Sequence, residues 1–334
     1  MKPTQPSPWP LRWAWALACA TFTLVAWGGF VTATGSGMAF RDWLTSDGVF
    51  MPFYPWLRAT GSKFIEHGHR LLGMTAGILS LALIASCWLG EASRTAKRFS
   101  IVLLIGVLLQ GVLGGMRVVL DERLLALLHG CAGPLFFAAT AVMVVLTGRS
   151  NDGGAQPASD AQRRLARVAV VTAVLAYLQL VLGALVRHAP LMTSPSAAGL
   201  FQTAVYLHVV AALAVTAHIV ILAVRCLRTQ TSVKAAIGLA ALLAVQLLLG
   251  VSSWIVKYGL PAWATSVIGE TGHFNRASDM ASAAVVTSHG AIGALIVALA
   301  AAIATRLVLH AGRYADVCVG VNHSELLTSQ EALA

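Results

Sequence analysis

Charged residues are scarce in this chain, and their scarcity excludes most classes of soluble protein. Only 11% of the 334 residues are charged, while 57% are hydrophobic and the mean hydropathy is +0.77. A soluble domain usually has about 25% charged residues and about 45–50% apolar ones. Acidic residues are especially few, 13 against 23 basic ones, but the basic residues interrupt apolar runs. They do not form the clustered basic face of a nucleic-acid-binding domain, so the composition is that of a membrane protein.

Cysteine is also rare and widely spaced. The chain has five cysteines and no Cys-x-x-Cys pair; they are Cys19, Cys87, Cys131, Cys226 and Cys318. A disulfide framework or a structural zinc site needs an even or closely spaced set of cysteines. The sequence therefore argues against both.

Long uncharged runs dominate what is present. Eight stretches of 18 to 37 residues contain no Asp, Glu, Lys or Arg, and about 20 apolar residues are enough to cross a bilayer as a helix. We predict an all-α integral membrane protein with eight transmembrane helices, near residues 13–33, 68–89, 99–117, 124–147, 166–187, 201–224, 235–256 and 284–306. The polar stretch 148–164 divides the chain into two halves, 1–150 and 151–334, which we expect to form two pseudo-symmetric four-helix bundles.

The distribution of basic residues predicts the orientation in the membrane. If both termini are cytoplasmic, the inner segments contain 14 basic and six acidic residues, and the outer segments contain nine and seven. Inner loops of membrane proteins carry the excess of Lys and Arg. We therefore expect a multi-pass protein of the cell (inner) membrane with both termini in the cytoplasm.

A histidine recurs near the start of every second predicted helix. The four are His69, His129, His208 and His289. A single histidine near a helix end can simply reach the interface, but four at equivalent places indicate a function, and all four would lie toward the outer face. Histidines on facing helices of a four-helix bundle form sites for metals or haem. The sequence thus predicts one pair in each half.

The odd-numbered predicted helices repeat a different pattern, Gln-x-x-x-Gly followed by a basic residue. It occurs at 110–114, 179–183 and 246–250, and it precedes Arg117, Arg187 and Lys257. The first helix ends comparably, in Gly28-Gly29. The repeat supports the division of the chain into equivalent units.

Two histidines per half favour haem over zinc. Zinc takes three or four nitrogen, sulfur or oxygen ligands, whereas the sequence offers two such histidines per half and no cysteine thiolate paired to them. A bis-histidine haem needs two axial imidazoles and an apolar slot. We assign no role to the other histidines, including His67, His188 and His218.

Glu66 distinguishes the first half from the second. It precedes His69 by three residues, which places the two side chains on one helix face about 4.5 Å apart along the axis. The second half has Ala204 or Val205 near the equivalent place before His208. An ion pair with Arg70 at i+4 is an alternative that leaves a catalytic role open. The first half is therefore expected to react and the second only to hold haem.

Taken together, these residues resemble the haem A synthase family. The resemblance extends from about residue 24 to 306 and rests on Glu66-His67-Gly68-His69-Arg70, which matches the family pattern E-x-x-H-R, with the three other histidines in register. The segment 30–43 also looks like the first outer loop of the family. One subgroup has a cysteine pair in that loop, and residues 34–65 contain no cysteine. The chain therefore resembles the subgroup without the pair, and its aromatic-rich loop 38–64 is expected to serve as a lid, a docking surface or an interfacial anchor.

The resemblance implies oxidation of the C8 methyl group of haem O to a formyl group, giving haem A for terminal oxidases. His69 and His129 would receive the substrate haem beside Glu66, and His208 and His289 would hold a haem b cofactor. Candidate contacts for the haem propionates are Arg70, Arg117 and Arg187. Implied partners are haem O, with haem O synthase and assembly factors of terminal oxidases.

Two other classes of protein compete with this interpretation. A b-type cytochrome that only transfers electrons would use the same histidines, but it needs no carboxylate such as Glu66. A transporter built from inverted repeats is disfavoured because each half has an even number of helices and no helix is visibly broken at mid-membrane.

Overall fold

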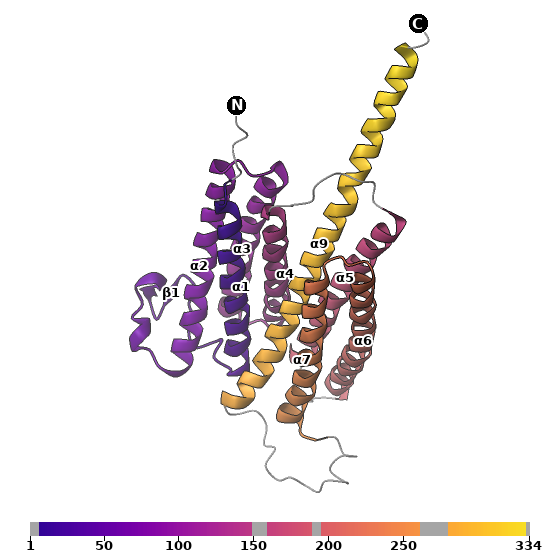
Figure 1. Cartoon of the computed structure of the whole chain (residues 1–334). Helices are drawn as coiled ribbons and strands as arrows, with labels where there is room; N and C mark the ends of the chain where they lie inside the picture. Colours follow the sequence, from indigo (N-terminus) through magenta and orange to yellow (C-terminus); the bar gives the residue numbers. More distant parts are fainter. Residues whose placement is uncertain (1–6, 149–158, 189–194, 261–279, 332–334) are drawn as a thin grey trace.

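The computed structural model describes residues 7–148, 159–188, 195–260 and 280–331, which are mostly helical (Figure 1). The α-helices are α1 (Trp9–Ala33), α2 (Gly61–Leu89), α3 (Arg94–Leu120), α4 (Arg123–Thr147), α5 (Asp160–His188), α6 (Pro195–Arg228), α7 (Val233–Tyr258) and α9 (Met280–Glu331). Within these described residues, eight helices are long and apolar enough to span a membrane, with α9 contributing Met280–Ala311. The prediction of an all-α membrane protein with eight spanning helices is confirmed.

Several helices begin earlier than the uncharged stretches suggest. The predicted second span starts at residue 68, but α2 starts at Gly61. The reason is local: Glu66 and Arg70 form an ion pair of 2.7 Å at i,i+4, so the helix carries both charges without a break. A boundary placed at the first charge therefore misses the first two turns of this helix.

In each half, the four helices contact one another in a closed ring. In the first half α1 contacts α2 and α4, and α3 contacts the same two helices; in the second, α5 and α7 each contact α6 and α9. The halves meet through α4 and α9, with further contacts from α1 to α9 and from α4 to α5. These contacts fit two adjoining four-helix bundles, although the pseudo-symmetry and the exact division at residue 150 stay predictions. The start of α1 and the end of α9 lie at the same end of the molecule (Figure 1).

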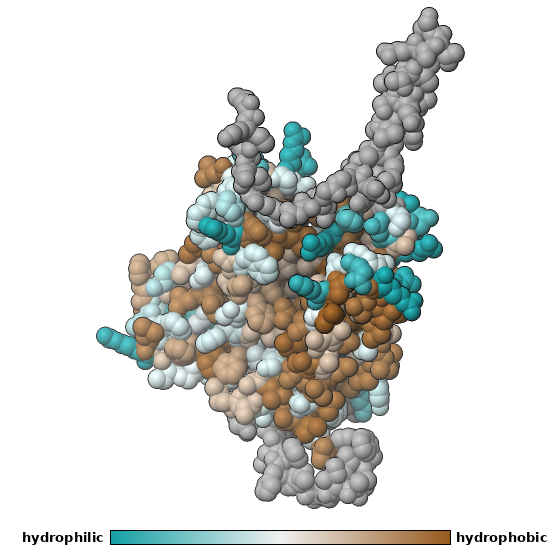
Figure 2. Space-filling model, in the orientation of Figure 1, coloured by the Kyte–Doolittle hydropathy of each residue, from teal (hydrophilic) through white to brown (hydrophobic). Residues whose placement is uncertain are grey.

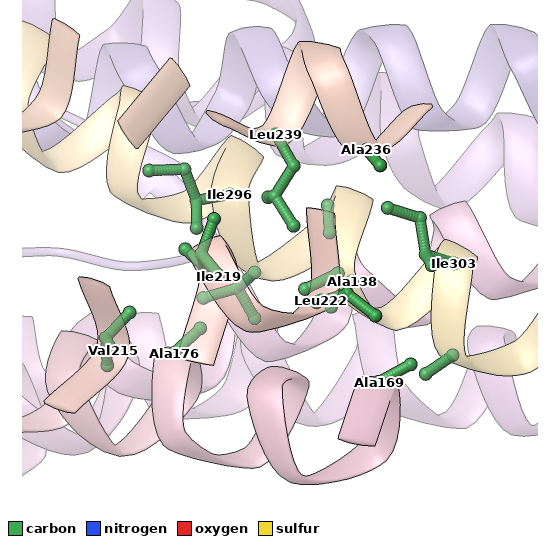
Figure 3. Packing of buried hydrophobic residues seen from close by; sticks show 14 of the residues in the cluster. Ala138, Ala169, Ala176, Val215, Ile219, Leu222, Ala236, Leu239, Ile296 and Ile303 are labelled. Carbon is green, nitrogen blue, oxygen red and sulfur yellow. The ribbon is translucent and has the colours of Figure 1, made fainter. Parts of the chain in front are cut away.

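Small apolar residues allow the helices of the second half to approach closely. Ala169 and Ala176 of α5 are buried beside Ile219 and Leu222 of α6, with Leu239 of α7 in the same cluster (Figure 3). Close contact between small side chains is how helices associate in lipid. Large apolar side chains instead face outward over the second half, while hydrophilic ones gather toward the end where α1 begins (Figure 2).

The segment between α1 and α2 folds against α2. It contains a two-stranded antiparallel hairpin of β1 (Thr45–Ser46) and β2 (Val49–Phe50), followed by the short 3-10 helices Met51–Phe53 and Trp56–Arg58. The hairpin turn is Asp47-Gly48, with φ of 52° and 77°, as a tight turn with two left-handed residues requires.

Asp42 stabilises the hairpin from within this segment. One of its carboxylate oxygens accepts hydrogen bonds from the Gly48 N–H (3.0 Å) and from the Thr45 hydroxyl (2.6 Å). Burial would raise the pKa of Asp42, but these bonds, helped by the positive charge of Arg70, hold it below its ordinary value. The ionised side chain therefore keeps the segment in a defined shape above α2.

Candidate functional site

A pair of histidines faces inward in each half. His69 of α2 lies opposite His129 of α4, with ring centroids 6.2 Å apart and ring planes inclined by 82°. His208 of α6 lies opposite His289 of α9, at 6.4 Å and 78°. The structure brings together the members of both predicted pairs in nearly the same geometry.

A glycine on the neighbouring odd-numbered helix makes room for each imidazole. A Cβ atom built on the glycine would lie close to Cε1 of the ring, at 2.7 Å for Gly28 and His69, 3.0 Å for Gly114 and His129, 2.9 Å for Gly183 and His208, and 3.2 Å for Gly250 and His289. Three of these glycines end the Gln-x-x-x-Gly patterns noted in the sequence. The side-chain amide of Gln179 donates to the His208 carbonyl at 2.8 Å, and Gln110 donates to that of His129 at 3.3 Å. The repeat therefore seats the histidines, which sequence reasoning alone did not reveal.

These glycines predict a measurable effect on haem ligation. Gly183→Ala places a methyl group where only 2.9 Å separates it from the His208 ring, so the ring must rotate or shift. If the histidine pair holds haem as the sequence predicts, we expect the purified variant to lose part of the low-spin haem absorption, measured by optical spectroscopy. Gly238→Ala in α7 is the matched control, because its nearest neighbour is 3.9 Å away. Equal spectra for both variants would show that the glycine does not position the ring.

Each pair leaves room for one metal ion between its rings. Two metal–nitrogen bonds of about 2 Å and two ring radii of about 1 Å place the centroids of axial imidazoles about 6 Å apart, close to the 6.2 and 6.4 Å found. The Nδ1 atoms of all four rings are buried without a hydrogen-bond partner among the described residues, and Nε2 of His208 lies 3.4 Å from the side-chain amide nitrogen of Gln179. In the described part of the chain, no group of three or more His, Cys, Asp or Glu could hold a metal ion. The geometry thus fits an iron ion whose remaining ligands belong to a bound group such as a porphyrin.

Both histidine pairs line one continuous, mainly apolar cavity of about 1600 Å³. A pocket for one small molecule typically measures about 300–1,000 Å³. The cavity is thus large enough for more than one ligand, and it connects the two halves of the molecule.

Only one of four equivalent positions in this cavity is acidic. The residues three positions before the histidines all line the cavity; they are Glu66, Ala126, Val205 and Val286. Because residues at i and i+3 share a helix face, each of them lies beside its histidine. The asymmetry between the halves that the sequence predicts is therefore present in the lining of the cavity.

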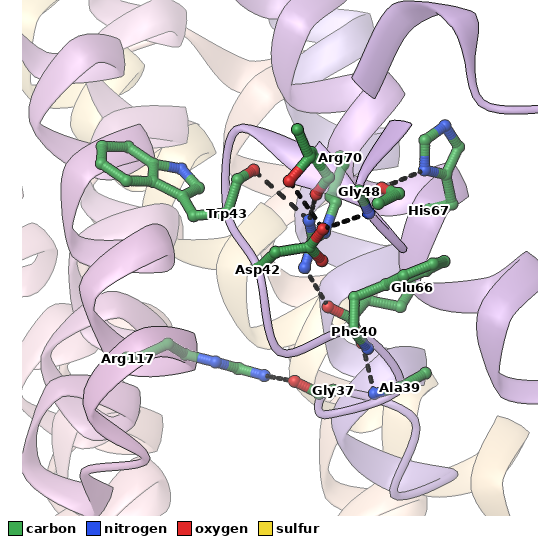
Figure 4. A network of polar contacts seen from close by, with 12 residues as sticks. Gly37, Ala39, Phe40, Asp42, Trp43, Gly48, Glu66, His67, Arg70 and Arg117 are labelled. Carbon is green, nitrogen blue, oxygen red and sulfur yellow. Dashed lines mark hydrogen bonds and ion pairs between the residues drawn. The ribbon is translucent and has the colours of Figure 1, made fainter. Parts of the chain in front are cut away.

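The Glu66 carboxylate is held by three donors (Figure 4). Its Oε2 accepts the backbone N–H groups of Ala39 at 2.6 Å and Phe40 at 3.2 Å, and its Oε1 accepts the Arg70 guanidinium at 2.7 Å. The residue as a whole is only 4% exposed. The ion pair with Arg70 that the sequence offered as an alternative is present, and the carboxylate still lines the cavity.

The three arginines expected near the propionates also line the cavity, and each donates to a backbone carbonyl. Arg70 donates to the Thr45 carbonyl at 2.9 Å, Arg117 to that of Gly37 at 2.7 Å, and Arg187 to that of Gly29 at 2.7 Å. The bonds of Arg70 and Arg117 connect the segment after α1 with α2 and α3, and the bond of Arg187 connects α1 with α5. The arginines therefore both shape the cavity and present positive charge to it.

His67 has structural contacts that no pattern in the sequence predicts. It is 1% exposed, its Nδ1 lies 3.0 Å from the Ser46 hydroxyl, and its ring packs on Tyr54 at 4.7 Å and on Phe40 at 6.0 Å. It attaches the segment after α1 to α2. This segment thus covers Glu66 in the manner of a lid.

These features define an eight-helix membrane protein in which two facing imidazole pairs and one fixed carboxylate share an apolar cavity. The chain belongs to the COX15-CtaA family of cytochrome oxidase assembly proteins, whose model matches residues 11–267. This is the haem A synthase family, so the resemblance inferred from the sequence is confirmed and the electron-carrier alternative is not favoured. No curated protein matches the chain. The matched stretch includes Glu66, His69, His129 and His208 and ends before His289.

Proposed function

We propose that this protein oxidises the C8 methyl group of haem O to a formyl group, with the first half as the reacting site and the second as the cofactor site. The observation that carries the proposal is that Glu66 is the one acid among the four equivalent cavity positions. A protein that only transferred electrons would need two similar haem sites and no carboxylate in either. His69 and His129 are the proposed ligands of the substrate haem, and His208 and His289 those of haem b.

The proposed reaction adds water to the methyl carbon in two oxidations. The first takes two electrons and two protons from the methyl group and water, giving an alcohol. The second takes the same number from the alcohol and water, giving a geminal diol that loses water to leave the aldehyde. The four electrons leave for an external acceptor, and haem b in the second half would supply one-electron transfer when bound.

The residues of this chain have distinct parts in the proposal. Removing electrons from the methyl group leaves positive charge on carbon, which a carboxylate already fixed in a low-dielectric site stabilises. Three donors occupy about three of the four lone-pair positions of Glu66. The remaining position can orient the attacking water or take its proton. The segment from Ala39 to Tyr54 excludes bulk water from this carboxylate.

The proposed location is the cell membrane, with both termini in the cytoplasm and both haem sites toward the outer face. Each of the four histidines lies within about four turns of the start of its helix, and all these helix starts are at one end of the molecule. Hydrophilic side chains gather at the opposite end (Figure 2), as expected for a cytoplasmic face. Haem O synthase and oxidase assembly factors remain the proposed protein partners.

The proposed function predicts which haems the protein contains. The full chain, purified after co-expression with an enzyme that makes haem O, should yield haem b together with haem O or haem A when its haems are extracted and separated by chromatography. The second site retains haem b, while the first holds substrate or product. Haem b alone, in the presence of abundant haem O, would contradict the proposal and favour an electron carrier.

A further inference from the structure

Basic residues meet at the outer end of the cavity, where the two halves join. Arg187 and His188 end α5, Lys257 lies next to the end of α7, and all three line the cavity. Arg117 of α3 lines the same cavity. His188 also lies against α4, since its Nε2 is 3.7 Å from a Cβ built on Gly130, the neighbour of His129.

No described carboxylate balances these cations in the second half. Arg187 donates to the Gly29 carbonyl at 2.7 Å, and Lys257 lies 5.3 Å from the centre of the Tyr258 ring. The three ion pairs among the described residues involve other side chains. Partly buried cations without a counter-charge are costly. The first half differs, because there Arg70 is paired with Glu66.

Unpaired hydroxyl groups lie in the same part of the cavity wall. The side-chain oxygens of Ser253, Tyr258 and Thr287 are buried and have no hydrogen-bond partner among the residues the structure describes. All three residues line the cavity. Cations and free hydroxyl donors together are the groups that bind an anion with several oxygen atoms.

We propose that Arg187, His188 and Lys257, with the hydroxyls of Ser253, Tyr258 and Thr287, form an anion site for the carboxylate groups of the tetrapyrrole held between His208 and His289. The inference rests on the proposed function, because it takes an iron tetrapyrrole as the occupant of the second half. It gives His188 and Lys257 a role in binding and adds them to Arg187.

The position of the cations fixes the orientation of this ligand. Arg187 follows Gly183 by one helical turn and Lys257 follows Gly250 by about two, which places them about 6 and 10 Å outward from the glycines that seat the two histidines. A tetrapyrrole has an apolar ring and two carboxylates at one edge. Its apolar body would lie in the cavity while the charged edge points to the outer face.

A phospholipid phosphate could offer the same anionic oxygens, so the experiment must separate the two sources. The full-length chain, produced in haem-starved cells and purified in detergent, is titrated with iron protoporphyrin IX and with its dimethyl ester, and binding is followed by the low-spin Soret absorption. The two probes share the ring and the iron but differ in the two carboxylates.

The wild type should bind the free acid about tenfold or more tightly than the ester, as expected for lost charge-assisted hydrogen bonds. Lys257→Gln should reduce this preference severalfold, and Lys257→Arg should preserve most of it. Lys234→Gln, at the opposite end of α7, is the matched control and should leave it unchanged. The conservative Arg variant separates loss of charge from misfolding.

Equal affinity of the wild type for acid and ester would overturn the anion site. So would a Lys257→Gln variant that keeps the preference but copurifies with less phosphatidylglycerol, since the anion would then be a lipid phosphate. A low-spin spectrum with either probe shows that histidine ligation is intact, so these outcomes bear on the anion site alone. Absence of any low-spin spectrum in the wild type would instead contradict the proposed function.

Discussion

Glu66→Ala is expected to lower the conversion of haem O to haem A by about a hundredfold or more, the usual effect of removing one fixed group that stabilises transition-state charge. The carboxylate lines the cavity one helical turn from His69 and is held by three donors, so it needs no reorganisation when charge develops. Haem b in the second half should remain bound, and haem O or its alcohol should accumulate. Chromatography of the extracted haems, normalised to haem b, measures the effect.

Two further variants separate chemistry from the structural contacts of Glu66. Arg70→Gln breaks the ion pair but keeps the carboxylate and its hydrogen bonds from Ala39 and Phe40, so it should lose much less activity than Glu66→Ala. Asp47→Asn breaks the exposed ion pair between the segment after α1 and Lys63 of α2, and it should retain the parental rate. If Glu66→Ala also makes haem A at the parental rate, Glu66 only anchors the segment and pairs with Arg70.

The fold was predictable because a bilayer leaves the chain few choices. Every backbone polar group must be satisfied within a spanning segment, so an uncharged apolar run of sufficient length forms a helix. Helix ends were less predictable, because they depend on side-chain pairs. Because Glu66 and Arg70 form an ion pair, α2 already begins at Gly61, before the charged residues after which hydropathy alone would start the helix.

Side chains marked by spacing within one helix or by a repeat were predictable, including the two histidine pairs, whereas other contacts between helices were not. The i,i+3 spacing placed Glu66 beside His69 without any structure. The fit of Gly28 against His69 joins residues of α1 and α2, and the bond from Arg187 to Gly29 joins α5 to α1. Such contacts depend on how the helices pack, and the spacing of residues along a single sequence does not predict that packing.

His208→Leu and His289→Leu are each expected to abolish the low-spin haem b spectrum of the purified protein. The two rings face each other at 6.4 Å, which suits one iron between them, so the loss of either leaves at most one axial ligand. Optical and electron paramagnetic resonance spectra of the purified variants measure the change. Because leucine fills a similar volume in an apolar wall, the helices should still pack, and membrane levels should stay near those of the wild type.

His218→Leu is the matched control, since His218 is in α6 like His208 but is not among the residues that line the cavity. It should keep the low-spin spectrum, and loss in this variant would indicate a general effect of removing a histidine from α6. The comparison also tests the assignment of the halves. If His69→Leu and His129→Leu remove the resident haem b while the His208 and His289 variants keep it, the cofactor lies in the first half and Glu66 beside it cannot act on the substrate.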